Sequence, residues 1–285
     1  MLLLSPSNSP PSPPMKRPLF CELCPLAFRI SRLKGILLRK LKDALSRRRF
    51  SKSCTSTPLP VLIKSHSSPI CRNLEGVDQE LQQNKAVNLA LAIEQINGIT
   101  IAPGETFSLW RLVGDTTAKK GYLPGLVIHR GKPTSGVGGG MCQLSNLLHW
   151  LALHSELSIT EMHHHERFNL FPDDNRVVPF GLGTSIVYNY LDYRVTNNTA
   201  HSYQFLLRIE DGELKGELRC AAPQEHNYAI RLENDRFVQE ADGVFRLGDI
   251  YRDEYSATGE LCHSELLRHN RALVMYELPT DALTE

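Results

Sequence analysis

A run of three glycines followed by an apolar segment constrains this chain more than any other feature of its sequence. Gly138, Gly139 and Gly140 lead through Met141 into Cys142, Gln143 and the apolar residues 144–157. Glycines remove every Cβ from a turn, so the backbone can adopt positive φ and a ligand or a second segment can come close. A helix that begins at Cys142 would hold its sulfur near unpaired N–H groups, which favours a thiolate. Cys142 is therefore a candidate nucleophile.

The same helix is predicted to have two different sides. Ser145, Asn146 and His149 fall on the side of Cys142, whereas most of the leucines fall opposite. We expect the leucines to anchor the helix and Cys142 to face a cleft. The alternative is that Cys142 is a small buried hydrophobic residue, which is the commonest fate of a lone free cysteine.

Three consecutive histidines at 163–165 supply candidate bases for a cysteine nucleophile. Successive residues of a strand point to opposite faces, so either His164 alone or the pair His163 and His165 would face the cleft. We predict that His164 or His165 transfers the proton; a purely structural role is the alternative for each. Neither these histidines nor the pair Cys21 and Cys24 has the further ligands of a zinc site, so we predict no metal and no cofactor.

Composition and charge limit which binding partners and which cellular compartment can be expected. The net charge of +1 gives no reason to expect nucleic acid. Seven cysteines are an odd number without regular spacing, which favours reduced thiols over a disulfide framework. We recognise no signal peptide and no apolar run of about 18 residues, the length that spans a bilayer. We therefore expect a cytoplasmic protein, and the sequence predicts no oligomeric state.

Three regions follow from the pattern along the chain. Residues 1–14 are a Pro/Ser tract that cannot form regular structure, and translation is predicted to start at Met15. Residues 15–70 are expected to hold a basic amphipathic helix and a linker rich in Ser, Thr and Pro. The apolar stripe of that helix either packs on the main domain or, through the basic residues 29–52, contacts the inner face of the membrane.

Residues 71–285 are expected to form an α+β domain. Early helices, one of them over residues 81–96, and the central helix bearing Cys142 would pack on a mainly antiparallel sheet. The expected strands are 99–101, 126–129, a meander of 188–196, 202–209 and 214–220, and further strands at 228–232, 244–251 and 272–278.

Several blocks of the sequence resemble the VanW family of bacterial proteins. The most specific are Pro-Gly-Glu-Thr-Phe-Ser at 103–108 and Gly-Gly-Gly-Met-Cys-Gln at 138–143, and the resemblance covers about residues 20–220. It implies a link to vancomycin-type glycopeptide resistance and to cell-wall peptidoglycan, but no particular activity. Members of the family carry Asp in the block that reads Gly-Leu-Gly-Thr at 181–184 here.

The order of glycine turn, cysteine helix, histidine and later polar residue is similar to that of transglutaminase-like and papain-like enzymes. This analogy suggests acyl transfer or amide hydrolysis on a peptide or a peptidoglycan precursor, with Cys142 attacking the carbonyl and its N–H helping to hold the oxyanion. Because Gly183 stands where the family has Asp, Asp192 is the candidate orienting residue.

The predicted substrate-binding residues are the three glycines of the run together with Gln143, Glu105 and Trp110. Each has a structural alternative: Glu105 in a turn, Trp110 in the core and Gln143 capping its own helix. The alternative function is a non-catalytic accessory module in which the glycine run binds a cell-wall peptide or a glycopeptide, and Cys142 only packs.

Overall fold

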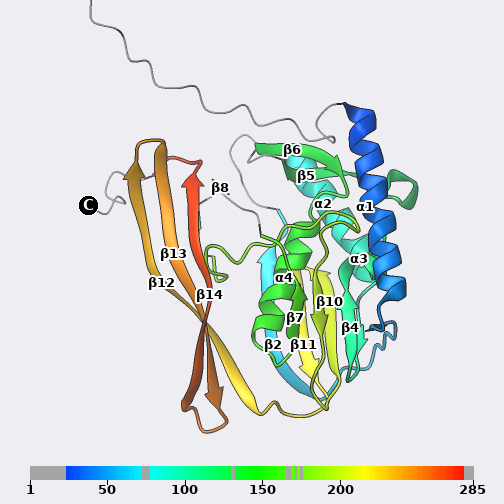
Figure 1. Ribbon diagram of the computed structural model, residues 1–285, viewed down its shortest axis with the longest axis vertical. Helices are drawn as coiled ribbons and strands as arrows, with labels where there is room; N and C mark the ends of the chain where they lie inside the picture. The colour runs from blue at the N-terminus through cyan, green and yellow to red at the C-terminus, as the bar shows by residue number, and fades with distance from the viewer. Residues whose placement is uncertain are drawn as a thin grey trace, which may run out of the picture.

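The computed structural model describes residues 24–71, 78–129, 132–164, 168–170, 172–173 and 176–278. The predictions for residues 1–14, Cys21 and His165 lie outside these ranges. Figure 1 shows the described part as a body of helices and sheets on the right and a separate sheet of long strands on the left.

The helices lie mainly in the first half of the chain. They are α1 (Pro25–Leu45), α2 (Gln79–Glu94), α3 (Leu109–Val113), the 3-10 helix η2 (Ala118–Lys120) and α4 (Met141–Leu153). Asp78 caps α2 by accepting a hydrogen bond from the Glu80 backbone, and Gly140 begins α4 with a φ of 106°, which glycine adopts without strain. Within the described residues, no helix is both long and apolar enough to cross a membrane.

In the described part of the chain, the strands form four sheets. The first has the order β1 (Arg49–Phe50), β4 (Glu105–Ser108), β9 (Arg194–Thr196) and β7 (Ser158–Glu161). The second has the order β2 (Val61–Pro69), β11 (Glu213–Cys220), β10 (Tyr203–Glu210) and β3 (Thr100–Ile101). The third has the order β12 (His226–Glu240), β13 (Gly243–Ser256), β14 (Leu261–Val274) and β8 (Phe168–Asn169). A hairpin of β5 (Pro124–His129) and β6 (Lys132–Val137) completes the set.

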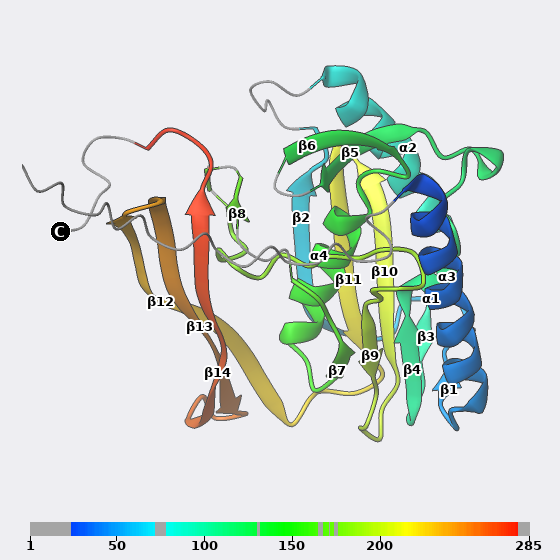
Figure 2. The same cartoon turned by 45° about the horizontal axis from the view of Figure 1, so that its top comes forward.

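Helix α4 is the centre of the main core. It packs across β11 and β2, as Figures 1 and 2 both show. Gly216 of β11 allows the close approach, because a Cβ there would lie 2.8 Å from the side chain of Leu147. Leu144, Leu148 and Leu151 are fully buried in the same core. The leucine side of this helix therefore anchors it, as the periodicity predicts.

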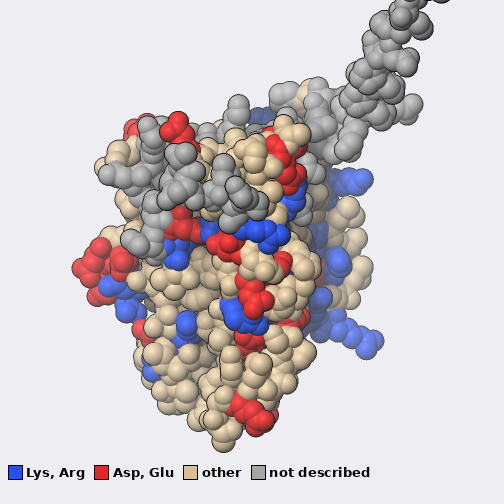
Figure 3. All heavy atoms as spheres, turned by 90° about the vertical axis from the view of Figure 1, so that its left-hand side faces the viewer, with Lys and Arg blue, Asp and Glu red and all other residues tan. Residues whose placement is uncertain are grey.

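The C-terminal sheet joins the main body through a second apolar cluster. Trp150 and Leu153 of α4 pack there with Leu182 and with Ile250 of β13. The outer surface of this sheet carries acidic and basic side chains intermixed with uncharged ones (Figure 3). Many of these charges are paired across strands, as in Arg271 with Glu240.

The α+β class and the mainly antiparallel sheets agree with the sequence prediction, and three elements correct it. The strand expected at 272–278 is β14, which begins earlier and ends at Val274. Residues 61–69, expected as linker, form β2 along the full length of β11. As an outer strand of its sheet, β2 tolerates Ser65, Ser67 and Ser68, so its composition hides it. Of the expected first strand of the meander, residues 188–196, only Arg194–Thr196 form a strand, β9. This strand pairs with β4 and β7 instead of β10.

Candidate functional site

The polar side of α4 faces the chain segment 183–186. Ser145 Oγ lies 2.5 Å from Thr184 Oγ1, and Asn146 Oδ1 accepts hydrogen bonds from the Thr184 backbone N at 2.7 Å and from its hydroxyl at 2.8 Å. Ser145 and Thr184 are fully buried. These bonds fix the segment against the helix face that carries Cys142.

Cys142 lies in the first turn of α4, half-buried against the main core. Burial raises the pKa of its thiol, and a hydrogen bond from the Ile186 backbone offsets only part of that rise. The thiol form is therefore favoured at neutral pH. The nucleophilic chemistry predicted from the sequence requires the thiolate, which this environment disfavours.

His149 lies two turns further along the same face of α4, and its side chain is 2 % exposed. Neither of its ring nitrogens has a hydrogen-bond partner among the described residues. Its ring meets that of Tyr193 edge to face, with centroids 5.7 Å apart. Burial and the nearby His164 lower the pKa of His149 to about 3, so the imidazole is neutral at physiological pH. A buried imidazole without partners is unusual and points to a missing hydrogen-bonding group.

The two described histidines of the triple run point to different partners. His164 pairs with Thr184 in an isolated β-bridge, and its Nδ1 donates to the Gly183 carbonyl at 3.1 Å. With the proton on Nδ1, a neutral His164 carries its lone pair on Nε2. His163 instead contacts the carboxylate of Glu161 at 3.2 Å.

His149 and His164 line a cavity of about 360 Å³ between the main body and the C-terminal sheet, which we call the histidine cleft. The main body contributes His149, Ala152, Leu153, Glu156, Leu157, Ser158, Ile159, Met162, His164 and Leu182, and the sheet contributes Tyr228, Arg252, Glu265, Leu267 and Arg268. Cys142 is not among these described lining residues. The cleft thus combines apolar walls, charges of both signs and two imidazoles. No group of three or more His, Cys, Asp or Glu side chains in the described ranges is arranged to hold a metal ion.

Asp192 lies in a different part of the body, in an ion cluster with Arg194. Its Oδ2 accepts from Arg194 Nε at 2.7 Å and from Ser108 Oγ at 2.5 Å, and its Oδ1 accepts from the backbone of Trp110 and Tyr193. These four donors include no histidine. The carboxylate predicted to orient a catalytic histidine is thus held by an arginine, a serine and two backbone groups.

The other predicted binding residues are also engaged within the chain. Trp110 is buried and donates its ring N–H to the Leu191 carbonyl at 2.9 Å. Glu105 accepts from the Ala102 backbone in its turn. Gln143 donates to Ser68 Oγ and to the Pro69 carbonyl, which ties α4 to β2.

The glycine run packs against other parts of the chain. A Cβ at Gly139 would lie 2.3 Å from the backbone of Gly125, and a Cβ at Gly138, whose φ is 78°, would lie 2.4 Å from Thr116. Asn88, fully buried, donates to the Gly139 carbonyl at 2.9 Å. The close approach that the glycines permit is thus used by the chain itself.

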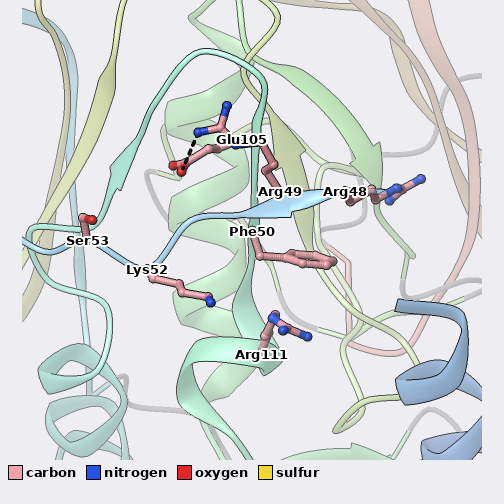
Figure 4. Close-up of a pocket in the computed structure, with 7 residues that line it drawn as sticks. All are labelled: Arg48, Arg49, Phe50, Lys52, Ser53, Glu105 and Arg111. Atoms are coloured by element: carbon pink, nitrogen blue, oxygen red, sulfur yellow. Dashed lines mark ion pairs between the residues drawn. The ribbon is translucent and has the colours of Figure 1, made fainter. Parts of the chain in front are cut away.

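A second hollow, of about 390 Å³, lies beside β1 and was not predicted from the sequence. It is lined by Arg48, Arg49, Phe50, Lys52, Ser53, Glu105 and Arg111. Figure 4 shows Lys52 and Arg111 on the same side of β1 as the Phe50 ring, and Arg49 on the other side, toward Glu105. The signal for it in the sequence was the dense run of basic residues that ends at Lys52.

Fold and site together define an α+β protein with a ligand-sized cleft built around a buried histidine. The family model described as "VanW like protein" matches residues 84–219. The chain is 34% identical over 222 residues to the "Vancomycin B-type resistance protein VanW" of Enterococcus faecalis, covering 78% of this chain and 80% of that protein. The chain therefore belongs to the VanW family.

A second relative is more distant. The uncharacterized protein YoaR of Bacillus subtilis is 30% identical over 115 residues, which cover 40% of this chain and 36% of that protein. No solved structure matches the chain.

Proposed function

We propose that this VanW-family chain takes part in resistance to vancomycin-type glycopeptides, or in cell-wall metabolism, by binding a cell-wall peptide in the histidine cleft. The observation that carries the proposal is the side chain of His149, which lies at the cleft, almost fully buried, with two ring nitrogens that no described residue satisfies. Both nitrogens are buried, so a bound ligand with a donor and an acceptor would satisfy them once the side chains around His149 shift to admit it.

The lining of the cleft suits a peptide ligand. A neutral imidazole offers one donor and one acceptor, and separate C=O and N–H groups of a peptide backbone offer the complementary acceptor and donor. The apolar walls suit short side chains, and the carboxylates and guanidinium groups of the rim suit the charged ends of a peptide. The name of the Enterococcus faecalis relative supports the link to vancomycin resistance. The proposal includes a cytoplasmic location, where uncrosslinked wall precursors would be the available peptides.

Calorimetric titration with a synthetic peptidoglycan stem peptide tests this proposal. The parent protein is expected to bind, and His149→Phe is expected to lose affinity by at least about tenfold, because a benzene ring offers neither donor nor acceptor. His201→Phe, an exchange of the same kind at an exposed histidine far along the chain, is the control and is expected to bind as the parent does. Binding of equal strength by the parent and by His149→Phe would reject the proposed site.

Acyl transfer or amide hydrolysis by Cys142, in a transglutaminase-like or papain-like arrangement, is the second candidate function. It is favoured by one observation: Cys142 lies in the first turn of α4, on the helix face that also carries His149 and meets the segment next to His164. It would require a thiolate in a place where burial raises the pKa of the thiol. Cys142→Ser separates the two candidates, since a binding module keeps its affinity whereas a cysteine enzyme loses turnover.

A further inference from the structure

The outer side of α1 is apolar to a degree that is rare on the surface of a soluble domain. Its exposed large apolar residues are Leu26, Phe28, Ile30, Leu33, Leu37, Leu38, Leu41 and Leu45. Leu37 is 65 % exposed and Leu45 is 75 % exposed. Most of them recur every three or four residues, so they form one stripe along a helix about 30 Å long. Figures 1 and 2 show α1 along the outer edge of the body, remote from the C-terminal sheet.

The side of α1 that faces the body is polar. Asp43 pairs with the buried Arg194, and Arg39 binds Glu161 through two hydrogen bonds of 2.5 and 2.6 Å. Arg32 pairs with Asp115. The sequence left open whether the stripe packs on the main domain, and the structure excludes this for its exposed leucines. The helix is amphipathic, but its apolar side faces outward and its polar side faces the body, which is the reverse of a normal surface helix.

The charged side chains of α1 also differ between its two sides. The cations that face the body, Arg32 and Arg39, have carboxylate partners. Arg29, Lys34, Lys40 and Lys42 form no ion pair with any residue in the described ranges. The only carboxylate of the helix, Asp43, is turned inward. The outer surface of α1 therefore combines an apolar stripe with unneutralised positive charge.

Further cations follow directly after the C-terminal end of α1. Arg48 and Arg49 follow α1 by only a few residues and line the hollow beside β1 together with Lys52 and Arg111 (Figure 4). Glu105 is the one acidic residue among the described residues that line this hollow. A face that is apolar along its length and cationic at its flanks and end matches the chemistry of an anionic membrane interface.

We propose that α1 lies in the surface of a bilayer containing anionic phospholipids and thereby docks the protein on the membrane. The leucine stripe would enter the boundary between head groups and acyl chains, while the flanking cations contact lipid phosphates. A second copy of the chain is a poorer occupant of this face, because pairing of two such helices would bring uncompensated cations together. This inference is independent of what the histidine cleft binds.

Flotation with lipid vesicles tests the proposal on the full chain. Binding is expected to vesicles of phosphatidylcholine mixed with phosphatidylglycerol, and not to vesicles of phosphatidylcholine alone. Raising the ionic strength to about 1 M is expected to weaken binding strongly, because the Debye length then shrinks to about 3 Å. These readouts use the parent protein and do not depend on any variant folding.

Substitutions on the outer face identify the surface. Lys34→Gln and Lys40→Gln are each expected to lower vesicle affinity about fivefold, and Leu37→Ser combined with Leu41→Ser by tenfold or more. Leu261→Ser is the matched control, because Leu261 on β14 is 53 % exposed, close to the 55 % of Leu41. Deletion of α1 is a worse test, since it would leave the buried Arg194 without Asp43.

Three results would overturn the proposal. The first is no binding to the phosphatidylglycerol vesicles at low salt. The second is binding that the α1 substitutions and the Leu261→Ser control affect equally. The third is a salt-insensitive dimer in sedimentation experiments that the Leu37 and Leu41 substitutions dissociate, which would assign the stripe to a second copy of the chain.

Discussion

Asp43 and Arg194, 151 residues apart in the sequence, form a two-pronged ion pair in which both guanidinium–carboxylate distances are 2.7 Å. Arg194 on β9 is 2 % exposed, and Asp43 is the inward-facing acid of α1. Asp192 accepts a third hydrogen bond from the same guanidinium group, because Arg194 Nε lies 2.7 Å from Asp192 Oδ2. This cluster attaches the outer helix to the centre of the body.

Asp43→Ala is expected to destabilise the protein by about 3–5 kcal/mol, because it leaves two N–H groups of a buried guanidinium without an acceptor. Denaturant unfolding measures the change. Asp115→Ala is the control, since the Arg32–Asp115 pair also attaches α1 but is exposed. It should cost less than about 1 kcal/mol. Equal effects of the two substitutions would show that the buried pair does not hold the helix.

The folded protein is expected to lose stability as the pH falls below about 6.5. An unfolded histidine binds a proton near that pH, whereas folded His149 stays neutral down to about pH 3. Between these values the unfolded chain holds the extra proton, so acid favours unfolding by about 1.4 kcal/mol per pH unit. His154, whose pKa burial lowers to about 4, adds to the effect.

His149→Phe should therefore flatten the pH dependence of unfolding between about pH 6 and pH 4, as measured by thermal melts across that range. It should also raise stability at neutral pH by about 1 kcal/mol, because two unsatisfied buried nitrogens disappear. An unchanged slope in this variant would mean that His149 finds a partner or solvent in the folded protein.

The glycine turn before α4 is expected to be sensitive to a single methyl group at one position. In Gly139→Ala the added Cβ would lie 2.3 Å from the Gly125 backbone, so we expect a loss of about 1–3 kcal/mol of stability. Gly183→Ala serves as comparison, because its Cβ would have nothing within 4 Å. That variant should stay within about 0.5 kcal/mol of the parent in a melting experiment.

Asn88 is expected to be a major structural residue of α2. Its side chain donates to the carbonyls of Leu123 and Gly139 and accepts from the Leu123 backbone, all within 2.9 Å. Asn88→Leu should cost about 2 kcal/mol or more, since the buried Gly139 carbonyl and the part-buried Leu123 N–H lose their partner, whereas the Leu123 carbonyl keeps its bond from Gly138. Asn84→Leu, one turn earlier with a single exposed bond to Pro124, should cost less than about 1 kcal/mol in the same unfolding measurement.

The local elements with strong periodicity were predictable from the sequence. The apolar spacing of α2 and α4 and the glycine run before α4 placed both helices within a few residues, and the alternation after residue 200 placed β10 and β11. The strand β2 was missed because its serines look like a linker, although Val61 and Ile63 alternate within it. Its partner β11 lies about 150 residues further along the chain, and local patterns carry no information about such pairing.

The site was predictable only in part. Helical geometry placed His149 on the face of Cys142, and strand alternation separated His164 from His163. That His149 lacks partners depends on how the C-terminal sheet closes over α4, which no local pattern encodes. The reversed orientation of α1 likewise depends on Arg194 and Glu161, two distant residues that attract its polar side inward.

Nitrogen NMR of the histidine rings during titration with a stem peptide is the most direct test of a ligand in the histidine cleft. Ring-nitrogen shifts report hydrogen bonding to each imidazole at the atom concerned. Saturable changes at His149 and His164, with none at His201 and His263, are the predicted result. A stem peptide that leaves the His149 nitrogens unchanged at saturating concentration would contradict the assignment of the cleft as its binding site.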